Sequence, residues 1–429
     1  MTSQRRRRLT LDLAPLRTSR EFRLLFGASS ISGLGSFITY VTVPYQVARI
    51  TDDPLMVGLL GLTELAPLLL MAFVGGALAD YLDRRLLVVG GELALTALTG
   101  VLLVNAISDT PHLWLLYVVA GLTAAVDGLQ RPAMEGLTPR VVTPEQIPAS
   151  SALNSLRMQI ASLAGPGIAG LLIAGADLVW VYAIDLATFA VSLLLLLLMR
   201  AVPPPPDAER PSLRAVVIGL RYAGSRPELL GSYLVDINAM FWGMPSALYP
   251  FLADKMGGPK VLGLLYAAPA IGSLLATLTS GWTGRVRRHG LMVLLAAGGW
   301  GVGIIGAGLT ELLWVTVACL AFAGAADMVS GLFRMTIWNQ TIPDHLRGRL
   351  AGIEMISYTT GPLLGHTRAG LMAKWTGVSG SIVAGGVLCV AGTAALALAL
   401  PRFRRYDGRD GLARKEAEEA AWAARTSDP

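Results

Sequence analysis

The stretch LLFGASSISGLGSFITYVTVPYQVA, residues 24–48, contains no Lys, Arg, Asp or Glu. A helix needs about 20 apolar residues to cross about 30 Å of hydrocarbon, and within lipid a helix satisfies its own backbone hydrogen bonds. Three further runs, 261–284, 291–310 and 379–400, also lack these four residue types. These runs predict membrane-spanning helices.

The composition of the whole chain agrees with a lipid environment. Of the 429 residues, 53% are hydrophobic and only 15% are charged, and the mean hydropathy is +0.57, whereas soluble domains carry about 25% charged residues. The start, MTSQRRRR, lacks a following apolar stretch with a cleavage site, so we expect no removed signal peptide. Cys319 and Cys389 lie inside apolar runs, which predicts packing roles and neither a disulfide nor a metal site.

Charges, prolines and turn residues divide the apolar pattern into separate spans, which predicts an all-α membrane protein. We expect twelve spans, near 24–48, 55–79, 86–107, 112–138, 149–174, 178–199, 228–252, 259–283, 290–309, 312–339, 350–374 and 379–400. Basic residues then fix the orientation. If the N-terminus is cytoplasmic, 27 of the 35 Lys and Arg residues fall in cytoplasmic segments and four in external ones. This bias predicts cytoplasmic termini, and the net charge of +6 needs no nucleic acid to explain it.

Two six-helix halves are expected, and the segments between them are basic. The predicted divisions are a cytoplasmic segment at 1–23, halves at 24–200 and 228–400, a linker at 201–227 and a cytoplasmic tail at 401–429. The linker opens with four prolines, which end a helix, and continues with a basic amphipathic stretch around 212–225, which predicts an interfacial helix.

Internal similarity supports the two halves. AAVD at 124–127 matches GAAD at 324–327, and the segments that follow also run in parallel at an offset of 200 residues. Parallel six-helix repeats place a substrate site between the halves near the bilayer midplane.

The segment GGALADYLDRR, residues 75–85, resembles the signature loop of the major facilitator superfamily, which lies between spans two and three. Glycines here are expected to allow close helix approach, an aspartate to cap or pair, and arginines to hold the turn at the cytoplasmic side. The resemblance implies a gating loop made by Gly76, Asp80, Asp83, Arg84 and Arg85. The equivalent second-half turn, 281–290, has arginines in place of the aspartates, so we expect a one-sided latch.

Within that superfamily the chain is similar to the enterobactin exporter group, which also contains drug-efflux relatives. The similarity runs over nearly the whole chain and is densest in the linker and in 247–282. The resemblance implies export driven by the proton gradient.

Ionisable residues inside spans are costly, at about 2.5–3.5 kcal/mol each, so they are candidates for function. In span four, Asp127, Arg131 and Glu135 share one helix face at spacings of four, which fits either a proton site tuned by an arginine or a static ladder of charges. In span ten, Asp327 and Arg334 mirror this arrangement, which favours a cavity.

Other residues extend the candidate site. Asp236 and Glu64 join Asp127 and Asp327 as proton-coupling candidates, and Arg131, Glu135, Arg334, Asn238, Trp242 and Trp338 are candidates for the substrate cavity. For the aromatic residues, contact with lipid or other helices is an equally simple interpretation. Glu92 and Asp185 are expected to be structural, whereas Arg157, His366 and Arg368 are expected either to contact an anionic substrate or to pack helices.

We therefore expect a secondary transporter of the bacterial inner membrane, monomeric, with membrane lipids, protons and a small amphipathic molecule such as a siderophore or drug as partners. No phosphate-binding loop of the GxxxxGK[ST] type occurs, so no ATPase is expected, nor any cofactor or metal. A lipid or lysophospholipid flippase of the same fold, and a non-transporting receptor or assembly partner, stay open as alternatives. A membrane enzyme is not expected, since no nucleophile and base are paired.

Overall fold

The computed structural model describes residues 12–202 and 221–427, apart from the side chains of Ala77, Asp80, His345, Gly348, Arg349, Ala351 and 425–427. Across these ranges the chain is helical, and its one β-type pairing is an isolated bridge between Arg288 and Asp407. The all-α prediction is confirmed. The interfacial helix expected around 212–225 falls mainly on residues outside this description.

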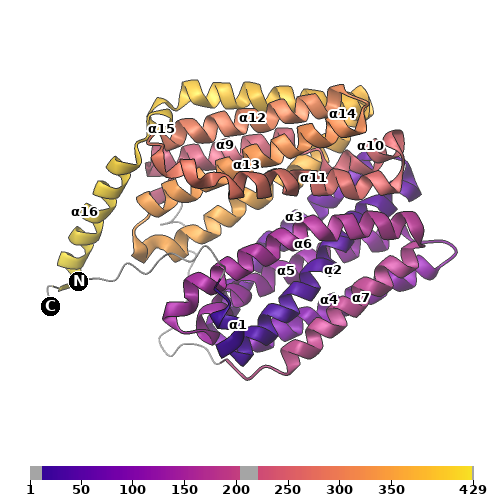
Figure 1. The fold of residues 1–429 in the computed structure, drawn as a ribbon, viewed down its shortest axis with the longest axis horizontal. Helices are drawn as coiled ribbons and strands as arrows, with labels where there is room; N and C mark the ends of the chain where they lie inside the picture. The colour runs from indigo at the N-terminus through magenta and orange to yellow at the C-terminus, as the bar shows by residue number, and fades with distance from the viewer. Residues whose placement is uncertain (1–11, 203–220, 428–429) are drawn as a thin grey trace.

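Helices from the first part of the chain form an N-terminal bundle (Figure 1). Polar residues start several of them: Ser19 caps α2 by accepting from the Phe22 nitrogen at 3.1 Å, and Asp53 caps α3 by accepting from the Leu55 nitrogen at 2.9 Å. The elements are α1 (Ala14–Thr18), α2 (Arg20–Thr51), α3 (Pro54–Tyr81), α4 (Arg84–Ile107), α5 (Leu113–Val141), η1 (Pro144–Gln146), α6 (Ile147–Gly175) and α7 (Leu178–Leu197).

The rest of the chain forms a C-terminal bundle and two helices beyond it (Figure 1). The elements are α9 (Pro227–Gly243), η2 (Ser246–Leu248), α10 (Tyr249–Met256), α11 (Pro259–Leu278), η3 (Ser280–Arg285), α12 (His289–Leu309), α13 (Leu313–Thr341), η4 (Asp344–Leu346), α14 (Arg347–Ala399), α15 (Pro401–Arg404) and α16 (Gly408–Ser427). The segment expected as a tail is thus helical where it is described. Helix α16 packs on α13.

Within the described ranges, ten helices are long and apolar enough to cross a membrane: α2 to α7 and α11 to α14. The difference from the twelve expected spans has two physical causes. Span seven is divided, since a break at 244–248 separates α9 from α10. Spans eleven and twelve fall in the single element α14, which changes direction at Gly377, where φ is 73°. Only glycine adopts this backbone conformation without strain.

Large apolar side chains cover the outside of both bundles, among them Leu70, Leu278 and Trp375. Polar side chains such as Asp185 and Ser232 are instead fully buried. A surface of this kind needs lipid as its solvent.

The two bundles meet through α3 against α14 and α6 against α11. They lie closest at the end that carries α10 and separate toward the end that carries α16 (Figure 1); we call these the α10 end and the α16 end. Glycines permit the contact, because a Cβ at Gly170 would lie 2.7 Å from the Gly263 Cα, and one at Gly370 would lie 3.0 Å from the Leu55 Cα. Small residues let helices approach in this way where side chains would hold them apart. At the same end Lys374 pairs with Asp53 at 3.2 Å, from one bundle to the other.

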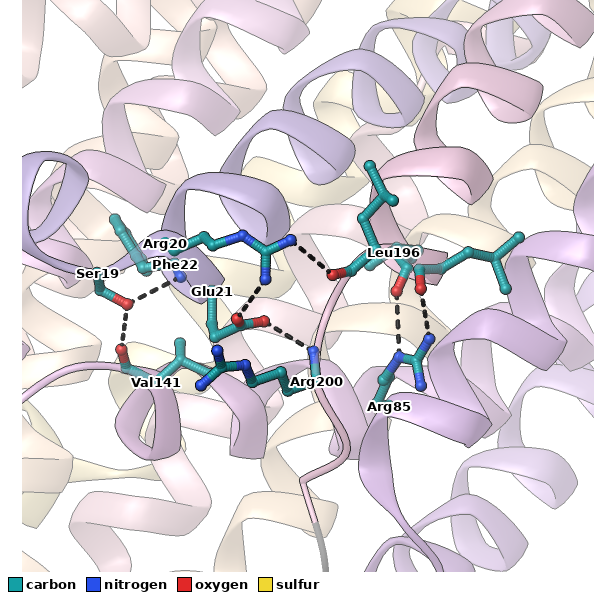
Figure 2. A network of polar contacts seen from close by, with 10 residues as sticks. Ser19, Arg20, Glu21, Phe22, Arg85, Val141, Leu196 and Arg200 are labelled. Carbon is teal, nitrogen blue, oxygen red and sulfur yellow. Dashed lines mark hydrogen bonds and ion pairs between the residues drawn. The ribbon is translucent and has the colours of Figure 1, made fainter.

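Polar contacts tie the N-terminal bundle together at its α16 end (Figure 2). Ser19 donates to the Val141 carbonyl at 2.6 Å, and the Arg20 side chain donates to the Leu198 carbonyl at 3.2 Å. Glu21 accepts from the Arg200 backbone nitrogen at 2.9 Å. The start of α2 is therefore fixed to the ends of α5 and α7, where orphan carbonyls need donors.

Candidate functional site

A cavity of about 170 Å³ lies among α2, α3, α4, α5 and α7 of the N-terminal bundle, and η2, α11 and α14 of the other bundle complete its lining. Pockets for drug-sized ligands measure about 300–1,000 Å³, so in the present conformation this cavity has room for only part of such a molecule. Its polar side chains are Ser36, Thr39, Tyr40, Glu64, Thr99, Thr123, Asp127, Ser246, Tyr266 and His366.

Glu64 and Asp127, two of the predicted proton-coupling candidates, both line this cavity. They reach it from α3 and α5, which pack so closely that a Cβ at Gly128 would lie 2.9 Å from the Ala72 nitrogen. Among the described residues, neither carboxylate has an ion pair. Two acids that belong to no ion pair of the described residues therefore face one space, which His366 also lines.

Four side chains close the cavity across the two bundles. The Ser246 hydroxyl lies 2.7 Å from Nε2 of His366, and the Tyr266 hydroxyl donates to the Ser246 carbonyl at 3.0 Å. The Tyr40 ring of α2 packs edge-on against that of Tyr266, with centroids 5.6 Å apart. Sequence reasoning singled out His366 but missed the other three, although the prolines on both sides of SALY at 246–249 marked a break in the span.

The C-terminal bundle holds a second polar centre, away from the cavity lining. Arg334 of α13 pairs with Asp236 of α9. It also pairs, at 3.7 Å, with Asp327, which lies two turns earlier on the same face of α13. Ser357 of α14 also donates to Asp236, at 3.3 Å. The expected pair of Asp327 and Arg334 is present, but Asp236, which is 4% exposed, is the nearer partner. Such a buried pair is stable when its members are satisfied together.

The charged stripe of α5 contains one of the two ion pairs that its spacing allows. Arg131 pairs with Glu135 at 3.5 Å, and its guanidinium lies over the Tyr358 ring of α14, 5.3 Å from the centroid. Both charged side chains are exposed, at 43% and 73%, and the ion pairs of the described residues do not include one between Arg131 and Asp127. Arg131 therefore contacts the other bundle while Asp127 faces the cavity.

Asn238, Trp242 and Trp338 lie outside the cavity lining, in contacts within the C-terminal bundle. Asn238 donates to the Cys389 carbonyl at 3.1 Å, and the Trp338 indole nitrogen donates to Ser232 at 3.1 Å. The Trp242 ring packs edge-on against that of the preceding residue. Burial of an amide or an indole demands such partners, and these contacts join α9 to α13 and α14.

The charged residues of the predicted gating loop hold helix ends within the N-terminal bundle. Asp83 caps α4 by accepting from the Arg85 nitrogen at 2.8 Å, and it also accepts from the backbone at the start of the linker. Arg84 donates to the Gly136 carbonyl of α5 at 2.8 Å, and Arg85 donates to the Leu197 carbonyl of α7 at 2.7 Å. Arginines near helix C-termini satisfy carbonyls and the helix dipole together.

Of the two glycines in this loop, one makes the close approach. A Cβ at Gly75 would lie 2.7 Å from the Leu129 Cα of α5, whereas one at Gly76 would meet nothing within 4 Å. Close helix approach was predicted at both glycines. The prediction is wrong for Gly76, because this residue faces open space. The Asp80 side chain lies outside the described part of the chain.

Arg368 of α14 fills the break between α9 and α10. It donates to the carbonyl of Phe241 at 3.1 Å, to that of Trp242, and to that of Ser381 at 3.4 Å. Helix α9 ends at Gly243, so its last carbonyls are the orphan acceptors that a broken helix leaves inside the membrane. Arg368 thus packs helices, one of the two roles expected for it.

The whole arrangement matches known transporters. Residues 10–424 match the model of a family described as transmembrane secretion effectors. The enterobactin exporter EntS of Shigella boydii serotype 18 is 31% identical over 406 residues, which are 92% of this chain and 95% of the relative. EntS of Escherichia coli O1:K1 is 30% identical over the same share of both chains.

Solved structures show the same fold at low sequence identity. A bacterial homologue of the human lysosomal transporter Spinster, in an inward-facing and unoccupied conformation, superposes with a TM-score of 0.68 at 16% identity and covers 92% of this chain and 99% of its own. The nucleoside transporter NupG also gives a TM-score of 0.68, at 11% identity, over 90% of this chain and 100% of its own. From the family model and the relatives together, this chain belongs to the transmembrane secretion effector family of the major facilitator superfamily, and it is a multi-pass membrane transporter and not an enzyme.

Proposed function

We propose that this protein exports a small amphipathic molecule, of the siderophore or drug-like class, in exchange for protons by alternating access. Its relatives are named as exporters of enterobactin, a small molecule carried outward. The proposal extends that direction, and a substrate of related size and polarity, to this chain.

The proposed topology has twelve membrane crossings in two six-helix halves, with both termini in the cytoplasm. Helix α14 supplies two crossings on the two sides of Gly377, and α9 with α10 supplies one. The α16 end then faces the cytoplasm, which agrees with the concentration of Arg and Lys in the segments at that end.

The observation that carries the proposal is the cavity with Glu64 and Asp127. It lies beside the contact between the bundles, so a rocking motion of one bundle against the other would change both its size and the side to which it opens. The glycine contacts at the α10 end support a conformation closed toward the outside.

The proposed proton coupling is supported by the absence of an ion pair to either of these two acids among the described residues. An ionised carboxylate in an apolar space is costly, and either a proton or a cationic or hydrogen-bonding substrate offsets that cost. One proton entering across about 100 mV supplies about 2.3 kcal/mol, which supports roughly a fiftyfold substrate gradient.

The test is transport by inside-out vesicles that carry the wild-type protein, with a panel of siderophores, drugs and lysophospholipids. We expect gradient-dependent uptake of a siderophore or drug, release of protons on substrate addition, and loss of both in Glu64→Gln/Asp127→Asn. Glu92→Gln is the matched control, since Glu92 is a buried carboxyl of α4 outside the cavity lining. Full gradient-driven transport by the double variant would refute the coupling role, and transport of lysophospholipid alone would favour a flippase.

A further inference from the structure

A second cavity, of about 480 Å³, lies at the α16 end, where the start of α9 meets α15 and α16. Seven of its lining residues are charged, and they carry both signs: Arg226, Arg402, Arg405, Arg414, Glu228, Asp407 and Asp410. A lining of this composition fits a zwitterion better than a simple anion or cation.

The basic side of the cavity has two available guanidinium groups. Arg402 and Arg405 are exposed, and within the described ranges neither side chain has an ion pair or a hydrogen bond. Arg226, by contrast, pairs with Glu418 of α16. Arg402 and Arg405 follow closely on the end of α14, so they lie at the depth of the lipid phosphates if α14 crosses the bilayer. The planar fork of an arginine matches phosphate geometry.

The acidic side of the cavity contains a buried carboxylate that lacks hydrogen-bond donors. Glu228, in the first turn of α9, is 5% exposed. Its ion pair with Arg414 spans 3.7 Å, which is too long for a hydrogen bond, and in the described part of the chain no donor hydrogen-bonds to it. Glu228 lines the cavity, so its oxygens can accept hydrogen bonds from a group that enters it. An ammonium group in the cavity would supply the missing donors, because it carries three N–H bonds on a compact charge.

We propose that this cavity binds the headgroup of a phosphatidylethanolamine molecule, with its phosphate on Arg402 and Arg405 and its ammonium group on Glu228. The inference depends on the proposed orientation, which places the α16 end at the cytoplasmic leaflet. A purely anionic headgroup would satisfy the arginines but would meet Glu228 and Asp410 with the same sign of charge. A choline headgroup has no N–H bond to offer Glu228. The bound lipid would join α9, the first helix of the C-terminal bundle, to α15, which follows that bundle.

The first experiment needs only the wild-type, full-length protein in detergent. Phosphatidylethanolamine, phosphatidylcholine and phosphatidylglycerol of the same chain length are titrated separately, and bound lipid is counted by native mass spectrometry. We expect phosphatidylethanolamine to bind about tenfold more tightly than either other lipid, the difference that one charge-assisted hydrogen bond provides. Equal binding of the choline lipid, or tighter binding of the glycerol lipid, would overturn the proposal.

Variants then locate the site. Arg402→Gln/Arg405→Gln and Glu228→Gln are each expected to lower the affinity for phosphatidylethanolamine about tenfold. Arg409→Gln is the matched control, because Arg409 is an exposed arginine of α16 outside the cavity lining, and it is expected to bind like wild type. Unchanged binding in both site variants would refute the assignment.

A last arm separates the lipid from a soluble ligand of the same chemistry. Phosphoethanolamine without acyl chains is added to the lipid-loaded protein, and we expect no displacement at concentrations that exceed the lipid. Displacement at equal concentration would identify a water-soluble ligand and overturn the membrane assignment. These assays measure binding alone, so their outcome and the outcome of the transport test are independent.

Discussion

The two bundles treat the acids inside their helices in opposite ways. In the N-terminal bundle, Glu64 and Asp127 face a cavity, and neither has an ion pair among the described residues. In the C-terminal bundle, Asp236 and Asp327 are both tied to Arg334. Asp127 and Asp327 occupy equivalent positions in the repeat, so the difference comes from their surroundings. One half thus holds its acids in ion pairs, while the other leaves them outside any ion pair of the described residues, which is what the proposed proton exchange needs.

The largest effect is expected from breaking the fixed pair. Arg334→Leu leaves Asp236 buried and unpaired, which should cost about 3–5 kcal/mol of stability, because removing one member of a buried ion pair exposes the full desolvation penalty of the other. The measurement is unfolding of the purified protein in mild detergent. Replacing both members, as Asp236→Leu/Arg334→Leu, should recover most of the loss. If Arg334→Leu were as stable as wild type, the pair would have no structural role.

The next effect compares the equivalent aspartates directly. Asp127→Asn should remove one coupled proton, worth about 2.3 kcal/mol at 100 mV, and so lower the steady-state substrate gradient roughly fiftyfold. Asp327→Asn should keep most of the gradient, since Asp236 still pairs with Arg334. Accumulation in inside-out vesicles measures both. An equal loss in the two variants would mean that the halves share the coupling role.

A smaller effect is expected where the bundles meet over the cavity. Ser246→Ala removes the contact between η2 and His366 of α14, worth about 1 kcal/mol, and should shift the balance between access states about fivefold. Distances measured by spin labels across the α10 end report this shift. Ser225→Ala is the control, because Ser225 donates only to the nearby Tyr222 carbonyl. An identical response in both variants would count against a gating role for the contact.

The smallest effect is expected from the exposed pair on α5. Arg131→Gln breaks the pair with Glu135, whose side chain is 73% exposed, and exposed pairs contribute about 0–1 kcal/mol. The same unfolding assay applies. A loss as large as that of Arg334→Leu would show that burial does not separate the two pairs.

Much of the fold could be predicted because lipid imposes one simple rule on the sequence. Charge-free runs predicted helices close to their observed bounds, as in the run 291–310, which is found as α12 (His289–Leu309). The break in span seven was not predicted, although Pro245 and Pro250 lie on its two sides. Its cause is a distant arginine, Arg368, that satisfies the broken end. No local pattern reports such a partner.

The candidate site was predicted in part for a similar reason. Acidic residues are rare inside membrane spans, and this identified Glu64 and Asp127, which both line the cavity. Rarity could not identify Tyr40 or Tyr266, which are ordinary residues at ordinary positions and acquire their place only through the packing of the two bundles. Nor could it tell that Arg334 would select Asp236 from another helix over Asp327 on its own.

The way in which Arg368 is held has a consequence for the transport cycle. Its partners are backbone carbonyls, which have no proton to gain or lose between pH 5 and 9. An arginine held by carboxylates would lose contacts whenever one of them was protonated, whereas the contacts of Arg368 do not depend on protonation. In the proposed cycle, the break between α9 and α10 can therefore keep its shape while Glu64 and Asp127 change their charge.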